Sequence, residues 1–184
     1  YDGFAQQHAH EWDFYASDLD GANIRQLTNE NLYKVSRLSL SPNGKNQLFV
    51  GPELDATQRH EIDLRYKNDP AVLAAHYFER DAEAITIYSL EQPPKARRVF
   101  KPHVQGESNF GPTFVDPIFL PDGENILFLA ANGNPFDYDV FEMNLQTQAV
   151  VKLTKGNGYA YSFRVAPDGK TAAFVRQEWQ QGQP

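Results

Sequence analysis

One short phrase occurs three times in this chain, each time between two apolar-rich runs. It consists of a proline, an Asn or Asp, and a glycine. Proline presets φ at the first central position of a turn, and Asn-Gly or Asp-Gly tolerates positive φ, so the phrase predicts a β-hairpin. The three copies are Pro42-Asn43-Gly44, Pro121-Asp122-Gly123 and Pro167-Asp168-Gly169, flanked by residues 35–40 and 47–50, 114–120 and 126–130, and 161–166 and 171–175.

A second phrase recurs in step with the first. An alternating run ends in a turn and is followed by a short run that closes on an apolar residue. The hairpin prolines Pro121 and Pro167 lie 46 residues apart, and four strands per roughly 40 to 45 residues is the period of a β-propeller blade. An antiparallel sandwich also predicts hairpins, but it gives no reason for two phrases to repeat in one order. The alternating runs are 13–19, 84–90 and 138–145, and the short runs are 24–28, 96–100 and 150–154.

These phrases predict an all-β chain made of propeller blades, each with four antiparallel strands. About three blades are expected within a single propeller segment that spans residues 1–184. The blade units fall roughly at residues 12–52, 84–130 and 138–176.

The sequence of the repeat resembles that of a known family. The segment from Asp18 to Thr28, DLDGANIRQLT, followed by Leu40 to Lys45, LSPNGK, is similar to the repeat of the TolB family of periplasmic proteins. The same repeat forms the propeller of prolyl oligopeptidase-type enzymes. The third unit is similar in Leu153-Thr154 and Ala166 to Lys170, whereas the middle unit departs, with Val99-Phe100 where Leu-Thr is usual. The resemblance implies a TolB-like β-propeller and a periplasmic or extracellular location.

Three units cannot close a ring, because propellers close with about 4 to 8 blades. Both ends of the sequence fall at the same phase of the repeat. We therefore expect these blades to belong to a larger ring of six. Further blades of a longer chain could complete that ring, or a homodimer could do so.

An insertion separates the first and second hairpin prolines, which lie 79 residues apart instead of 46. The excess falls at residues 53–83. Asp69 before Pro70 is a good helix start, and residues 71–80 are rich in helix formers, so a partly helical insertion is predicted. A further hairpin, with residues 62–66 and 72–78 as its strands, is the alternative that periodicity leaves open.

Composition excludes several classes of function. The chain has 17 Lys and Arg against 24 Asp and Glu, for a net charge of -7, and no basic stripe, which argues against a nucleic-acid partner. It has no cysteine, which excludes disulfides, thiolate zinc sites and a cysteine nucleophile. No apolar run approaches the roughly 18 residues of a membrane span. The first seven residues also lack the basic start and apolar middle of a signal peptide.

Candidate chemistry is sparse. His8 and His10, in a segment with two carboxylates, are of the residue types that bind divalent metals. In an extended segment Glu11 points away from both, so a solvent-facing loop is the favoured interpretation and the two histidines are weak metal candidates. Asp18-Leu19-Asp20-Gly21 resembles the start of a calcium loop, but its twelfth position is Asn29 rather than Glu, so a turn is expected.

No catalytic residue and no cofactor is predicted, because the chain has neither a Gly-x-Ser-x-Gly elbow nor a phosphate-binding Gly-x-x-x-x-Gly-Lys loop. The favoured function is a non-catalytic scaffold of the bacterial envelope that binds a protein or peptide. Two alternatives stay open. One is a propeller that gates a peptidase whose catalytic domain lies outside this chain, and the other is a metal-dependent sugar lyase or hydrolase.

Overall fold

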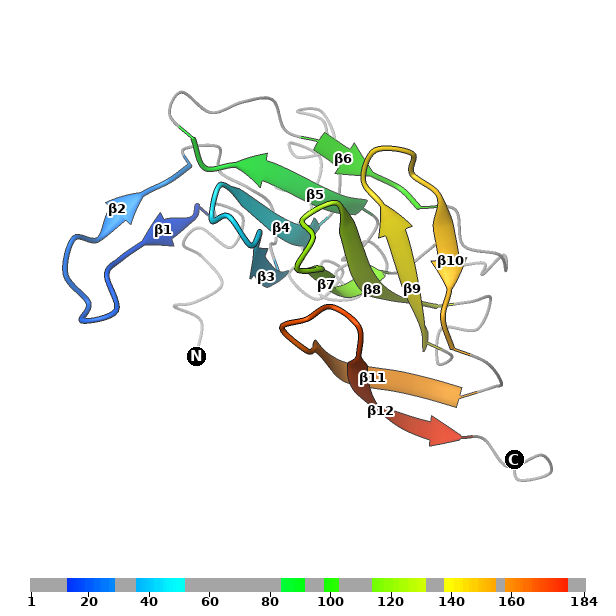
Figure 1. Ribbon diagram of the computed structural model, residues 1–184. Helices are drawn as coiled ribbons and strands as arrows, with labels where there is room; N and C mark the ends of the chain where they lie inside the picture. Colours follow the sequence, from blue (N-terminus) through cyan, green and yellow to red (C-terminus); the bar gives the residue numbers. More distant parts are fainter. Residues whose placement is uncertain are drawn as a thin grey trace, which may run out of the picture. The chain divides into compact units, whose positions relative to one another are not determined.

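The computed structural model describes residues 13–28, 36–51, 84–91, 98–102, 114–131, 138–154 and 158–178. These residues form antiparallel sheets of two or four strands, in agreement with the predicted all-β class, and they contain no helix (Figure 1). Their strands are β1 Tyr15–Ala16, β2 Arg25–Gln26, β3 Ser36–Leu40, β4 Asn46–Gly51, β5 Ala84–Ser89, β6 Arg98–Phe100, β7 Phe114–Phe119, β8 Asn125–Ala131, β9 Tyr138–Asn144, β10 Val150–Lys152, β11 Gly158–Val165 and β12 Ala172–Glu178.

The chain divides into two compact units. The first comprises Tyr1–Val35 and Gly51–Asp81, and the second comprises Ser36–Val50 and Ala82–Pro184. In the first unit the described strands are β1 and β2, an antiparallel hairpin in which Tyr15 pairs with Gln26. Its turn is closed by the Asp18 N–H, which donates to the Ala22 carbonyl at 2.9 Å, with Gly21 at φ 83°.

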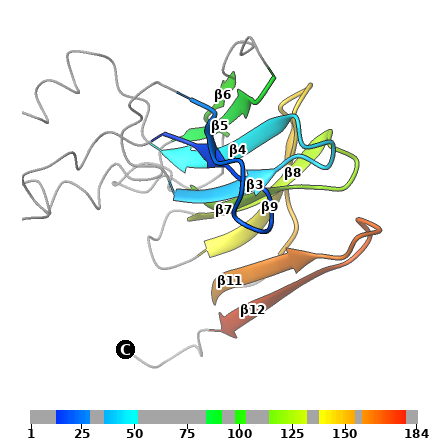
Figure 2. The same cartoon turned by 90° about the vertical axis from the view of Figure 1, so that its left-hand side faces the viewer.

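The second unit holds two complete four-stranded sheets and one two-stranded sheet. The first sheet runs β3-β4-β5-β6, the second runs β7-β8-β9-β10, and β11 pairs with β12 alone among the described strands. In both complete sheets every strand lies beside its neighbour in sequence, so each sheet is an antiparallel meander (Figures 1 and 2). Such meanders are the blades of a β-propeller.

The sheets and the repeat units differ in phase. Each complete sheet begins at a proline-containing hairpin, whereas each predicted unit begins one hairpin earlier. The range 84–130 therefore supplies the last two strands of the first sheet and the first two of the second. The predicted insertion at 53–83 lies outside the described residues; in chain order it joins β4 to β5, which are neighbours in the first sheet.

All three predicted hairpin turns are confirmed, and they share one geometry. The glycine has a φ between 68° and 70°, and its N–H donates to the carbonyl of the residue that precedes the proline. The Asn or Asp side chain accepts a hydrogen bond from the main-chain N–H two residues later, which stabilises the turn locally. These bonds join Asn43 to Lys45 at 3.0 Å, Asp122 to Glu124 at 2.8 Å and Asp168 to Lys170 at 3.0 Å.

The second complete sheet is covered on both faces. Along β8, Ile126, Phe128 and Ala130 pack into a core shared with the first sheet. Leu127 and Leu129, which point the other way, pack into a second core shared with β11. Successive side chains of β8 point to opposite faces, and both faces are covered by neighbouring sheets. Every covered position of such a strand is therefore apolar, which gives the continuous apolar run that is typical of a strand buried on both sides.

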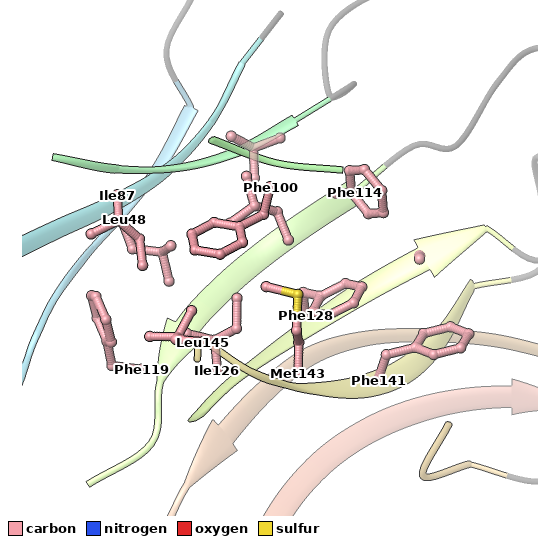
Figure 3. Close-up of a cluster of buried hydrophobic side chains, with 13 residues drawn as sticks. Leu48, Ile87, Phe100, Phe114, Phe119, Ile126, Phe128, Phe141, Met143 and Leu145 are labelled. Atoms are coloured by element: carbon pink, nitrogen blue, oxygen red, sulfur yellow. The ribbon is translucent and has the colours of Figure 1, made fainter. Parts of the chain in front are cut away.

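Aromatic rings fill the core between the two complete sheets. The Phe128 ring lies edge-on to Phe114 at 5.7 Å between centroids and stacks on Phe141 at 5.8 Å. Figure 3 shows this group beside Met143, with Leu48 and Phe100 of the first sheet on the facing side. Ring pairs of this kind add to the stabilisation that buried apolar area already provides.

Phe128→Ala is expected to lower the free energy of unfolding by about 3–5 kcal/mol, because it removes a fully buried ring and leaves a cavity. Urea unfolding followed by tryptophan fluorescence or circular dichroism measures the change. Val151→Ala on β10, where the side chain is 56% exposed, is the matched control and should change stability by less than about 0.5 kcal/mol. Equal losses in the two variants would contradict the proposed core.

Asp122 gives the second hairpin a pH dependence. Partial burial raises the pKa of this carboxyl, but hydrogen bonds from the Asn125 side chain and from the Asn125 and Glu124 main-chain N–H groups outweigh burial, so the pKa lies below its ordinary value. A carboxyl whose pKa is lowered on folding stabilises the protein above its unfolded pKa of about 3.9. That stabilisation is lost as the pH falls through the folded value.

We expect Asp122→Asn to be less stable than the unaltered chain at pH 6–7, and this difference to shrink and then disappear as the pH falls through the lowered pKa of folded Asp122. Asn preserves an acceptor oxygen for the turn, so the substitution isolates the charge. Urea unfolding of both proteins across this pH range measures the difference, in which the titration of all other groups cancels. A difference that does not vary with pH would show that the charge of Asp122 contributes nothing.

Candidate functional site

A buried polar network joins the start of β9 to the residues that follow β10. The Thr154 hydroxyl donates to Asp139 Oδ1 at 2.6 Å and accepts the Val140 N–H at 3.1 Å. Lys152 Nζ lies 2.5 Å from the other oxygen of Asp139. Asp139 is only 4% exposed. A buried carboxylate of this kind is stable when it is both paired and hydrogen-bonded.

The first unit repeats this network. The Thr28 hydroxyl donates to Asp13 Oδ1 at 2.7 Å and accepts the Phe14 N–H at 2.9 Å. In place of Lys152 stands Gln26, whose side-chain amide donates to Asp13 Oδ2 at 3.2 Å. The threonine of the Leu-Thr phrase therefore has a structural role, because it ties together the last two strands of a blade.

The register shows how the middle unit departs from this pattern. Ile85 pairs with Phe100, as Val140 lies opposite Leu153 in the next sheet. The Leu-Thr position is therefore occupied by Phe100-Lys101, one residue later than the Val99-Phe100 that the sequence alignment indicates. Ala84 stands at the position of the buried aspartate, so this sheet has no Asp-Thr pair at that place.

We expect Thr154→Val to lower the free energy of unfolding by about 1–3 kcal/mol. The substitution leaves the Val140 N–H and one Asp139 oxygen without their buried partner. Thr171→Val, at an exposed position that begins the run into β12, is the control and should be nearly neutral. Calorimetric melting of the two variants makes the comparison, and a neutral Thr154→Val would show that the network contributes no stability.

A different feature marks the first strand of the three sheets in the second unit. In β3, β7 and β11 the pairing register shifts at the same place, between Ser36 and Ser39, between Val115 and Ile118, and between Tyr161 and Arg164. A β-bulge of this kind adds a residue to one strand and re-aims a side chain, often beside a functional site. β3 and β7 lie side by side (Figure 2), and the Phe119 N–H donates to the Ser39 hydroxyl at 3.4 Å.

Two of the bulges hold a non-glycine residue at positive φ, Asp116 at 50° and Ser162 at 52°. This conformation is uncommon outside glycine and concentrates where function constrains the backbone. By register the corresponding residue of β3 is Arg37. Beside Ser162, Arg164 donates through Nη1 to the Phe163 carbonyl at 2.7 Å. We name Asp116, Ser162 and Arg164 the bulge row.

The bulge row offers a carboxylate, a hydroxyl and a guanidinium along the first strands of neighbouring blades. These groups suit the recognition of a polar or extended chain, since all three can bond main-chain or charged groups. Sequence reasoning did not identify the row. One signal was present, because Pro117 inside the apolar run 114–120 indicates a bulge in a strand, whereas Ser162 has no comparable signal.

The residues considered as ligands from sequence fall in two groups. His8 and His10 lie outside the described residues, and their metal role stays a prediction. Asp18 and Asp20 form a turn, as expected, since Asp18 Oδ2 accepts from Asn23 at 2.6 Å and Asp20 Oδ1 accepts from the Ala22 N–H at 2.9 Å. In the part of the chain that the structure describes, no three His, Asp or Glu residues gather as metal ligands. No helix there is long and apolar enough to cross a membrane.

Stacked four-stranded meanders, joined by repeated hairpins, define this chain as a β-propeller scaffold. Comparison with solved structures makes the assignment narrower: the fold is TolB-like. TolB from Acinetobacter baumannii matches 97% of this chain and 38% of its own, with 19% sequence identity and a TM-score of 0.54. A putative TolB from Agrobacterium tumefaciens matches 92% of this chain and 51% of its own, with 14% identity and a TM-score of 0.54.

A chain of a nidogen/laminin complex matches more distantly, at 10% identity and a TM-score of 0.52, over 89% of this chain and 48% of its own. The present chain thus spans between 38% and 51% of the lengths of these three structures. No protein-family model matches the sequence, and neither does any curated protein. At sequence identities of 10% to 19%, the similarity to these solved structures establishes the fold of the chain and nothing more.

Proposed function

We propose that this chain is a non-catalytic propeller scaffold that binds a protein, through an extended peptide segment, along the bulge row. The observation that carries the proposal is the recurrence of a positive φ at Asp116 and Ser162, at the same place in successive first strands. Non-glycine residues in this conformation cost about 1–3 kcal/mol each. The same conformational free energy is spent at the same place in two blades, and this recurrence favours a role of these residues in recognition.

The first strand of a blade is a suitable place for such a peptide. Blades of a propeller surround a central channel, so one edge strand of each blade faces that channel. Loops and bulges carried on a rigid sheet hold polar side chains in fixed positions, which lowers the entropic cost of binding. The Asp116 carboxylate and the net charge of -7 favour a peptide that carries Lys or Arg.

The comparisons support this proposal at the level of the scaffold. One of the similar structures is a complex of nidogen with laminin, two proteins, which supports a protein partner for our proposed scaffold. The resemblance of the repeat to the TolB family, and the bacterial origin of two of the similar structures, support a location of our proposed scaffold in the bacterial envelope, in the periplasm or outside the cell.

Peptide phage display on the immobilised chain tests the proposal, and it does not require the partner to be identified first. We expect enriched peptides to contain Lys or Arg, and synthetic versions to bind Asp116→Asn about tenfold more weakly, a loss of about 1.4 kcal/mol. Asn tolerates positive φ, so this variant removes the charge and retains the bulge. Asp168→Asn, in the exposed turn before β12, is the matched control and should bind normally.

Two outcomes would contradict the proposal. One is the absence of any enriched peptide on a chain that circular dichroism shows to be folded. The other is a set of peptides that bind Asp116→Asn and the unaltered chain equally well, which would place recognition on a different surface.

A further inference from the structure

The side chain of Arg176 on β12 is incompletely satisfied. Its Nε and Nη2 atoms are buried and have no hydrogen-bond partner in the described part of the chain. A guanidinium is always charged and carries five donors, and a buried charge is stable only when it is paired. Arg176 lies opposite Ala160 of β11, and no described strand pairs with the other edge of β12.

The repeat shows what belongs beside this arginine. Ala130 of β8 follows its hairpin glycine, Gly123, by the same number of residues as Arg176 follows Gly169. In the complete second sheet Ala130 pairs with Asp139, the first buried residue of the Asp-Thr network on the next strand. A strand that joined β12 in the register of β9 would therefore place the repeat's aspartate opposite Arg176.

The β1–β2 hairpin has the chemistry of that missing strand. It carries the same network through Asp13 and Thr28, and β11–β12 and β1–β2 are complementary halves of a blade, the first two strands and the last two. We propose that β12 of one chain pairs with β1 of a second copy, so that Asp13 of the second copy neutralises Arg176. This inference rests on the fold alone and is independent of the bulge row.

The register of the junction follows from the two complete sheets. In the second sheet the Leu145 N–H donates to the Glu124 carbonyl at 2.9 Å, and in the first sheet the Leu90 N–H donates to the Lys45 carbonyl at 2.8 Å. The corresponding groups at the junction are the Leu19 N–H and the Lys170 carbonyl. Leu145 is 7% exposed, whereas the side chain of Leu19 is fully exposed, as expected of a residue whose partner sheet belongs to another copy.

The same register accounts for further apolar exposure. It sets Phe174, which is 40% exposed, opposite Tyr15, which is 61% exposed, and cross-strand aromatic pairs stabilise sheets.

The described strands of one copy form two complete sheets and two halves, β1–β2 and β11–β12. A dimer in which each copy pairs its β12 with β1 of the other would complete both halves through two identical junctions.

Disulfide trapping tests the junction directly, because the chain contains no cysteine. The register places Ala16 opposite Ala173, as Glu142 lies opposite Leu127 in the second sheet. This pair shares no main-chain hydrogen bonds, and in such pairs the Cα atoms lie about 4.5 Å apart, within the range for a disulfide. Ala16→Cys and Ala173→Cys are made as separate proteins, checked for folding by circular dichroism, mixed and oxidised mildly.

We expect a cross-linked dimer on a non-reducing gel for this mixture and at least fivefold less for the control mixture of Ala16→Cys with Ala172→Cys, whose side chains point to opposite faces. Light scattering of the unaltered chain should give twice the mass of one chain. Arg176→Glu should shift the assembly to monomer while the fold persists, and Arg176→Lys should restore part of the dimer.

A monomeric chain with no cross-link above the control would overturn the proposal, since the β12 edge would then be completed by further residues of a longer chain or by another protein. Equal cross-linking in both mixtures would overturn the register. Neither result affects the peptide-binding test, in which Asp116 is altered and the β12 edge is not.

Discussion

The structure depends on one constraint: the second sheet is apolar on both faces, so it cannot exist alone. Phe128 and Leu129 are neighbours in β8, yet they enter different cores, one shared with the first sheet and one shared with β11. A single meander would leave one of these rows in water, at a cost of about 25 cal/mol for each Å² of apolar surface. Blades must therefore stack, and each blade is stabilised by its neighbours.

This constraint explains which features the sequence predicted and which it did not. The hairpins are local, because a proline, an Asn or Asp and a glycine fix each turn through bonds within a few residues, and so they were predictable. The phase of the sheets is not local. A repeat of four strands reads the same from any starting strand, and only pairing across residues 51–84 shows that β4 and β5 belong to one sheet.

Individual repeats are also free to lose signals that the fold does not require in every blade. The Asp-Thr network is present around Asp139 and around Asp13, and it is replaced by Ala84 and Lys101 in the first complete sheet. That loss is why sequence alignment misplaced the Leu-Thr position there by one residue. The bulge row was missed for a related reason: backbone conformation at Ser162 is set by pairing with β12 and leaves no mark in residue type.

Two kinds of surface differ in how they relate to the repeat. At the first strands the feature is conformational and recurs, since Asp116 and Ser162 both take a positive φ at the same place in β7 and β11. On β12 the departure is chemical, since Arg176 stands where Ala130 stands in the complete sheet. An alanine there needs no partner, but a guanidinium with two buried donor nitrogens does. The arginine therefore makes the edge of β12 selective for a strand with an acidic residue at one register, which an apolar edge could not achieve.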